Sequence, residues 1–161
     1  MIRLKTSVLL AAALKIGAIL GGAPEKDAQL LYDFGIKMGL AFQLQDDYLD
    51  VYGDPAVFGK KIGGDILCNK KTFMLITALS LSEGEDKETL LNWLRATDYV
   101  AEEKIQSVTA LYNKVGVPEL CQARIDAYYK EGLELLDKVN VESSLKEELK
   151  KFVCHLMDRK L

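Results

Sequence analysis

Residues 42–50 hold a cluster of acidic side chains: Asp46, Asp47 and Asp50. Asp46 and Asp50 are four residues apart, so in a helix they share one face, and Gln43 lies one turn earlier. The cluster disfavours folding, because like charges repel and the C-terminal end of a helix already carries partial negative charge. Mg²⁺ would compensate, since it is typically held by one or two carboxylates together with substrate phosphates. The pattern therefore indicates a magnesium and phosphate site, and the alternative is a solvated acidic helix end.

Lysines occur on both sides of this cluster in the sequence. Lys60 and Lys70 lie within and after a glycine-rich segment, and Lys5 precedes Thr6 at the start of the first apolar segment. The P-loop pattern GxxxxGK[ST] is absent. Taken singly, each lysine would be an ordinary surface cation. Carboxylates suited to Mg²⁺ together with several lysines are the groups expected for diphosphate chemistry, because the bound Mg²⁺ and the lysines both stabilise the negative charge of a diphosphate.

The elements that must position these residues are predicted to be helices. Apolar residues recur at helical spacing along most of the chain, and the three prolines fall between the periodic segments. Residues 53–69 are predicted to form a loop. The fold class is therefore all-α, a helical bundle of roughly six or seven helices in one domain, residues 1–161. The expected helices span residues 2–20, 25–52, 71–81, 86–94, 101–115, 121–139 and 144 to about 158.

Two glycines lie on the same predicted helical face as Asp46. Gly39 and Gly35 precede Asp46 by seven and eleven residues. Glycine in a helix interior costs about 1 kcal/mol relative to alanine, so two of them on one stripe indicate that space is being kept. Either a neighbouring helix packs closely there, or a slim apolar ligand lies in a groove below the carboxylates.

Composition excludes several other classes of protein. The chain has 161 residues, 49% of them hydrophobic and 28% charged, which suits one globular domain. The net charge of −3 gives no general attraction to nucleic acid or to an anionic membrane. Three widely spaced cysteines without a CxxC pair indicate neither a disulfide framework nor a zinc site. No apolar run is long enough to span a membrane. We expect a cytoplasmic protein with no nucleic-acid partner and no membrane span.

At these residues the sequence resembles the C-terminal half of a trans-isoprenyl diphosphate synthase, of the polyprenyl synthetase family that includes farnesyl and geranylgeranyl diphosphate synthases. Phe42-Gln43 followed by Asp46-Asp47-x-x-Asp50 is similar to the family's second aspartate-rich motif. Gly59-Lys60 through Asp65 to Lys70 resembles the basic loop that follows, and Lys5-Thr6 resembles the upstream KT pair. The resemblance covers essentially the whole chain and is strongest over residues 5–72.

The resemblance implies a partial isoprenoid synthase fold and Mg²⁺-dependent, head-to-tail condensation of isopentenyl diphosphate with an allylic isoprenyl diphosphate. Mg²⁺ and lysines draw off the allylic diphosphate, isopentenyl diphosphate attacks the resulting cation, and a proton is lost. Asp46 would ligate Mg²⁺ directly, with Asp47 and Asp50 supporting it or its waters, and Asp65 would lie behind them. The allylic diphosphate would be held by Lys5, Lys60 and Lys70. Thr6 and Gln43 would lie beside the reacting carbons, and Phe42 would also bind the substrate.

One family feature is absent from this sequence. The first aspartate-rich motif, DDxxD or DDx4D, should precede the KT pair, and nothing like it occurs before Lys5. We therefore expect a C-terminal half that is inactive alone, and a homo-oligomer because the apolar faces of the first two helices would be exposed. Two alternatives are a non-catalytic helical partner subunit of a prenyl synthase and a terpene cyclase-like protein. The clustered charges argue against a non-catalytic subunit, because a purely structural protein would be more stable without them. The GKxxGxD loop argues against a terpene cyclase.

Overall fold

The computed structural model of the chain describes residues 2–54 and 62–157. Within these residues the secondary structure is helical and no strand occurs, which confirms the all-α prediction. The chain divides into two compact units. Unit 1 contains residues 2–45 and 123–157, and unit 2 contains residues 46–54 and 62–122. Helices α2 (Glu25–Tyr52) and α8 (Val117–Asp137) contribute residues to both units, and the expectation of a single domain stays a prediction.

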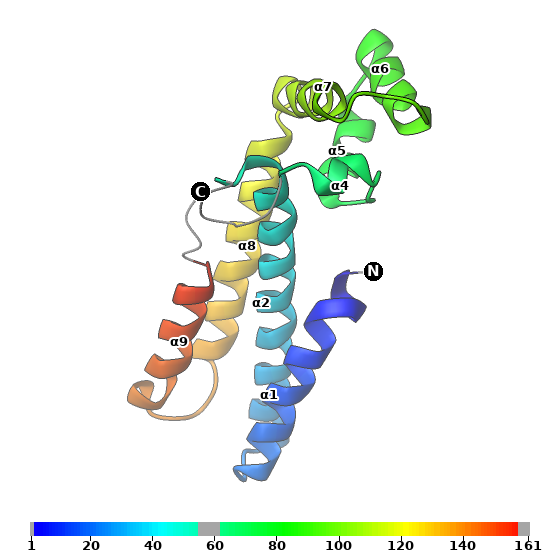
Figure 1. Ribbon diagram of the computed structural model, residues 1–161. Helices are drawn as coiled ribbons and strands as arrows, with labels where there is room; N and C mark the ends of the chain where they lie inside the picture. The colour runs from blue at the N-terminus through cyan, green and yellow to red at the C-terminus, as the bar shows by residue number, and fades with distance from the viewer. Residues whose placement is uncertain (1, 55–61, 158–161) are drawn as a thin grey trace. The chain divides into compact units, whose positions relative to one another are not determined.

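Unit 1 is built from four α-helical segments that lie side by side (Figure 1). A short π-helical turn, η1 (Arg3–Ser7), leads into α1 (Val8–Leu20), and the other segments are the first part of α2, the last part of α8, and α9 (Ser143–Met157). The core joins α2, α8 and α9 through Phe34, Met38, Leu136 and Val153. Leu10 and Leu14 of α1 pack against this core, so all four segments share it.

The glycines of α2 are explained by close packing against the first helix. A Cβ added to Gly35 would lie 2.6 Å from the Cα of Ala11 and 2.9 Å from Cδ1 of Leu14. Real Cβ atoms do not approach other atoms so closely. Gly39 is equally close to Ser7, which directly precedes α1. The first of the two sequence-based explanations, a neighbouring helix rather than a ligand groove, therefore holds at Gly35.

Unit 2 consists of the end of α2, the start of α8 and four helices between them. These are α4 (Gly64–Leu67), α5 (Phe73–Leu81), α6 (Gly84–Arg95) and α7 (Ala101–Lys114). α7 contacts α4, α5 and α6 and so forms the centre of the unit. The prediction of a loop over residues 53–69 is wrong for residues 64–67, where α4 forms. One helical turn is too short to show apolar periodicity, and Gly63 and Gly64 suggested an irregular segment.

The helix boundaries of unit 2 otherwise agree with the sequence pattern to within a few residues. α5 begins where Thr72 caps it, because the Thr72 hydroxyl accepts a hydrogen bond from the backbone N–H of Leu75 at 3.2 Å. In the part of the chain that the structure describes, no helix combines the length and the apolar character needed to cross a bilayer.

Candidate functional site

Asp50, near the end of α2, accepts backbone hydrogen bonds from the segment that follows the helix. The N–H of Gly63 donates to the Asp50 carbonyl at 2.6 Å, and the N–H of Asp65 donates to Oδ2 of Asp50 at 2.8 Å. Gly63 has a φ of +86°, and a Cβ there would lie 2.6 Å from Ile105, so only glycine fits this turn. The turn therefore holds Asp65 beside Asp50.

Lys70 links Asp65 to a further carboxylate of the same unit, that of Asp47. Its Nζ donates to Oδ1 of Asp47 at 2.9 Å and to Oδ2 of Asp65 at 2.7 Å. The side chain of Asp47 is 3% exposed, whereas that of Lys70 is 33% exposed. Burial lowers the pKa of Lys70, but its hydrogen bonds to Asp65 and Asp47 outweigh that effect and raise the pKa above the usual range. Lys70 therefore remains an ammonium and neutralises part of the acidic cluster.

Asp50 lies in a negative environment despite Lys70. Burial raises the pKa of its carboxyl, the hydrogen bond from the Asp65 N–H lowers it, and the charges of Asp65 and Asp47 raise it further. The net effect is a raised pKa, so the ionised form of Asp50 is disfavoured. An additional cation near Asp50 would relieve this.

The donor set of α2 fits a magnesium ion that takes most of its ligands from elsewhere. Asp46 and Asp50 are half-buried and four residues apart on the helix, so their carboxylates share a face. Over residues 2–54 and 62–157, no group of three or more His, Cys, Asp or Glu side chains is placed to hold a metal by itself. Mg²⁺ needs only one or two protein carboxylates when water and phosphate supply the rest. The residues present therefore suit a metal that binds together with a phosphate ligand.

The predicted phosphate ligand Lys60 lies outside the described residues. The other predicted residues are divided between the two units: Lys5, Thr6, Phe42 and Gln43 belong to unit 1, and Asp46, Asp47, Asp50 and Lys70 belong to unit 2. Within unit 2 the structure brings Asp47, Asp50, Asp65 and Lys70 into one hydrogen-bonded network.

In unit 1, Thr6 and Gln43 are in direct contact. Thr6 Oγ1 donates to Oε1 of Gln43 at 2.9 Å, although the two residues are 37 positions apart in the sequence. Lys5 and Thr6 lie in the π-helical turn Arg3–Ser7, in which the N–H of Val8 donates to the Arg3 carbonyl. Single π-turns are rare and are frequent at functional sites. The sequence predicted an ordinary helix here, because the pattern of apolar residues does not distinguish a π-turn from an α-turn.

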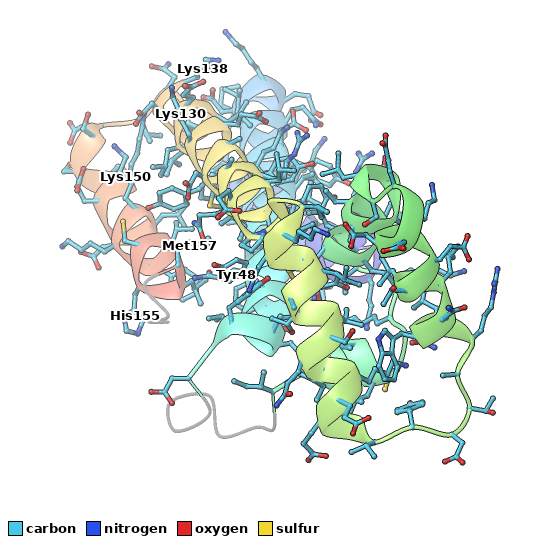
Figure 2. All side chains as sticks on the ribbon, turned by 90° about the horizontal axis from the view of Figure 1, so that it is seen from above. Tyr48, Lys130, Lys138, Lys150, His155 and Met157 are labelled. Atoms are coloured by element: carbon cyan, nitrogen blue, oxygen red, sulfur yellow. The ribbon has the colours of Figure 1, made fainter. Side chains whose placement is uncertain are left out.

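An apolar pocket of about 220 Å³ opens beside this contact in unit 1. Its walls are Thr6 and Leu10 from the first helix, Phe42 and Gly39 from α2, and the end of α9. Met157 is the last residue of α9 (Figure 2), and its carbonyl accepts a hydrogen bond from Nε2 of Gln45 at 2.8 Å. This bond attaches the end of α9 to α2, and Met157 itself lines the pocket.

Sequence analysis missed two residues next to the network of unit 2. Asn69 immediately precedes Lys70 and has a φ of +50°, the left-handed conformation. Lys104 of α7 is fully buried and donates to Oδ1 of Asn69 at 2.7 Å. A signal was available, because Lys104 precedes the buried residues Val108 and Leu111 by four and seven positions. The sequence pattern instead placed only the helix over residues 101–115 and gave Lys104 no role.

Comparison with known proteins identifies relatives over the whole chain. The family model described as Polyprenyl synthetase matches residues 1–113. A short chain isoprenyl diphosphate synthase of Methanothermobacter thermautotrophicus is 37% identical over 148 residues, which cover 90% of this chain and 45% of the relative. A geranylgeranyl diphosphate synthase of Sulfolobus acidocaldarius is 30% identical over 160 residues, 99% of this chain and 48% of the relative. The chain thus spans about half the length of these curated relatives.

Solved structures of related proteins have the same fold over half their length. A crystal structure of a geranylgeranyl pyrophosphate synthase matches 99% of this chain and 50% of its own with a TM-score of 0.88 and 38% identity. A geranylgeranyl pyrophosphate synthase from Corynebacterium glutamicum, solved with isoprenyl diphosphate and magnesium, matches 98% of this chain and 45% of its own. Its TM-score is 0.85 at 30% identity. The chain therefore has a partial isoprenoid synthase fold and belongs to the polyprenyl synthetase family.

Proposed function

We propose that unit 2 binds the diphosphate group of an allylic isoprenyl diphosphate together with Mg²⁺, as one part of an isoprenyl diphosphate synthase. The observation that carries this proposal is the network in which Lys70 pairs with Asp47 and Asp65 while Asp50 accepts the N–H of Asp65. The network keeps several carboxylates close together, which only a cation would favour. A relative solved with isoprenyl diphosphate and magnesium supports the identity of the ligands.

The two faces of α2 have different roles in this proposal. Asp46 and Asp50 would hold Mg²⁺, which supplies positive charge to a departing diphosphate. Asp47 would support them from behind, because its side chain is 3% exposed and is already paired with Lys70. Lys70 is one-third exposed, so its ammonium can serve a diphosphate as well as the carboxylates. Lys60 would be a second diphosphate ligand.

The predicted residues of unit 1 have roles of their own in this proposal. Thr6 lines the apolar pocket, and its hydrogen bond to Gln43 fixes the position of its hydroxyl. Phe42 and Leu10 provide apolar surface suited to a hydrocarbon chain. We propose that Thr6 and Gln43 face the allylic carbons, that Phe42 contacts the chain, and that Lys5 contributes positive charge for the diphosphate.

The complete reaction would be head-to-tail condensation of the allylic diphosphate with isopentenyl diphosphate. Since the chain spans about half the length of its relatives, we propose that it does not carry out this reaction alone. We further propose that it is cytoplasmic, has no nucleic-acid partner and forms homo-oligomers. A prenyl transfer assay with geranyl diphosphate, isopentenyl diphosphate and Mg²⁺ should give no extractable product. If the unaltered chain forms product and the Asp46→Ala variant does not, the proposal that this chain is inactive alone is wrong.

Binding of inorganic pyrophosphate tests the site itself. Calorimetric titration in the presence of Mg²⁺ should show binding to this chain, and chelation of Mg²⁺ should abolish it. Asp46→Ala should weaken binding by about 10- to 100-fold. Asp33→Ala is the matched control, because Asp33 is an acidic residue of the same helix whose carboxylate accepts a hydrogen bond from the side chain of Gln29. Equal loss of binding in both variants, or none in either, would contradict the assignment of Asp46.

A further inference from the structure

Lys104 is a buried cation that the proposed function does not use. Its side chain lies in the first turn of α7 and is 0% exposed. Nζ donates to Oδ1 of Asn69 at 2.7 Å and lies 4.3 Å from the centre of the Tyr99 ring. Within the part of the chain that the structure describes, Lys104 forms no ion pair with a carboxylate. The ammonium is therefore held by one amide oxygen and one aromatic face.

This arrangement is unfavourable for the stability of α7. Burying an ammonium without a counter-ion removes its hydration, and a cation near a helix N-terminus opposes the helix dipole. A hydrophobic residue of similar size would avoid both penalties. Since such a lysine has no evident benefit for packing, the contact that it makes with Asn69 is the feature to explain.

Asn69 controls the direction of the chain just before Lys70. Its backbone is left-handed at φ +50°, and its Nδ2 donates to the carbonyl of Leu94 at 3.1 Å. With Oδ1 bound to Lys104, both ends of the Asn69 amide are fixed. Directly after this turn, the N–H of Lys70 donates to the Asp65 carbonyl at 2.9 Å. The direction in which Lys70 leaves the turn decides whether its ammonium reaches Asp47 and Asp65.

A small cavity confirms that Lys104 and the network are neighbours. Lys104, Asn69, Lys70 and Asp65 all contribute to its walls, and it has space of about 10 Å³, enough for a water molecule. Lys104 thus adds positive charge on the same cavity that Asp65 lines, while its hydrogen bond fixes the adjoining turn.

We propose that Lys104 is a positioning residue, which holds the Asn69 turn and thereby directs Lys70 to Asp47 and Asp65. The effect on the turn is independent of the proposed function. The consequence for Mg²⁺ and pyrophosphate binding rests on the proposed function. Lys104 itself would not touch the substrate.

Amide hydrogen exchange, followed by NMR on the full chain, tests the effect on the turn. Lys104→Met keeps the apolar stem and removes the ammonium. The amides of Asp65 and Lys70 should then exchange at least about 10-fold faster, while amides in the centre of α7 keep their rates. Asn69→Gly permits the left-handed backbone and removes both the acceptor for Lys104 and the bond to Leu94, so it should accelerate exchange at least as much. The double variant should exchange no faster than Asn69→Gly alone, because that variant already lacks the bond to Lys104.

Leu111→Val is the control for a merely structural role. Leu111 is buried on the same helix but has no polar group, so its truncation should not change exchange at Asp65 and Lys70 relative to the rest of unit 2. If Lys104→Met accelerates exchange evenly across α7, or leaves Asp65 and Lys70 unchanged, Lys104 does not position the turn.

Pyrophosphate titration in the presence of Mg²⁺ tests the consequence for binding. Lys104→Met should bind about 10-fold more weakly than the unaltered chain, and Leu111→Val should bind equally well. Absence of binding by the unaltered chain would refute the proposed function, yet the exchange measurement would still decide the role of Lys104. Binding by the unaltered chain that Lys104→Met leaves unchanged would refute the inference and leave the proposed function standing.

Discussion

Gly39 of α2 lies directly against Ser7: a Cβ added to Gly39 would be 2.6 Å from the Cα of Ser7 and 2.7 Å from its Oγ. Ser7 is fully buried, and the nearest atom is backbone, so no rotation of a side chain relieves the overlap. Gly39→Ala should therefore force the first helix away from α2. We expect the free energy of unfolding to fall by about 2–3 kcal/mol, measured by urea denaturation.

Gly17 provides the matched control for this prediction. It lies within α1, and a Cβ added there would meet nothing within 4 Å. Gly17→Ala should raise the free energy of unfolding by roughly 0.5–1 kcal/mol, because alanine favours the helix. Opposite signs at the two positions are the expected result. A similar gain in both variants would show that the first helix does not pack against Gly39 as described.

The ion pair between Lys70 and Asp47 gives a second prediction. Lys70→Met would leave the carboxylate of Asp47 almost fully buried and without that ammonium. We expect a loss of roughly 2–3 kcal/mol in the free energy of unfolding, somewhat less than for a completely buried pair because Lys70 is 33% exposed. Urea denaturation at neutral pH measures it.

A double-mutant cycle separates this charge effect from lost packing. Asp47→Asn in the Lys70→Met background should recover part of the stability, because an amide needs no counter-ion. The coupling should be favourable and should exceed about 1 kcal/mol. Strictly additive losses would mean that the ammonium and the carboxylate do not interact in solution.

The three cysteines should differ in reactivity, and this difference depends on pH. Cys121 is buried, and burial together with the charge of Asp47 raises the pKa of its thiol to about 12. Cys68 and Cys154 are exposed. At pH 8, iodoacetamide followed by mass spectrometry should label Cys68 and Cys154 in the folded protein, and Cys121 only after unfolding in urea. Labelling of Cys121 at the rate of the other two would contradict its burial.

The same pKa shift fixes the direction of a stability change. The unfolded Cys121 thiol ionises near its ordinary value of 9.0, whereas the folded one stays protonated to about 12. Above pH 9 the unfolded state therefore binds fewer protons, and stability falls as pH rises. The raised pKa values of Tyr52 and Tyr112, caused mainly by burial, act in the same direction. Thermal unfolding midpoints should decline from pH 8 to 10.5, and less steeply in Cys121→Ala.

The sequence predicted the long helices well because local patterns determine them. Apolar periodicity and breaks at glycine or proline located α2, α5, α6 and α7 to within a few residues. The carboxylates and Lys70 were found for a similar reason, since unusual charges at helical spacing stand out in a sequence. The family then follows from the matched residues 1–113.

Long-range contacts could not be predicted from local patterns. Nothing in the sequence indicates that Thr6 binds Gln43, or that the Asp65 N–H binds Asp50. The sequence showed Gly35 and Gly39 on one helical face. Only the close contact between Gly35 and Ala11 shows that a helix, and not a ligand, lies next to Gly35. Lys104 was overlooked because a lysine is usually exposed, and only the three-dimensional position of Asn69 shows why this one is buried.

The exposed face of α1 leads to a prediction about assembly. Leu9, Ile16 and Leu20 are 78%, 56% and 83% exposed and are spaced seven and four residues apart, so they form one apolar stripe. Such a stripe favours association, and light scattering should give a mass above the 17.9 kDa of one chain. Leu9→Glu combined with Ile16→Glu should shift the protein toward the monomer, because each charge would be desolvated in the interface. Leu145→Glu changes an equally exposed leucine of α9 and should leave the mass unchanged. A monomer in the unaltered protein, or equal effects of all these substitutions, would show that the stripe does not drive association.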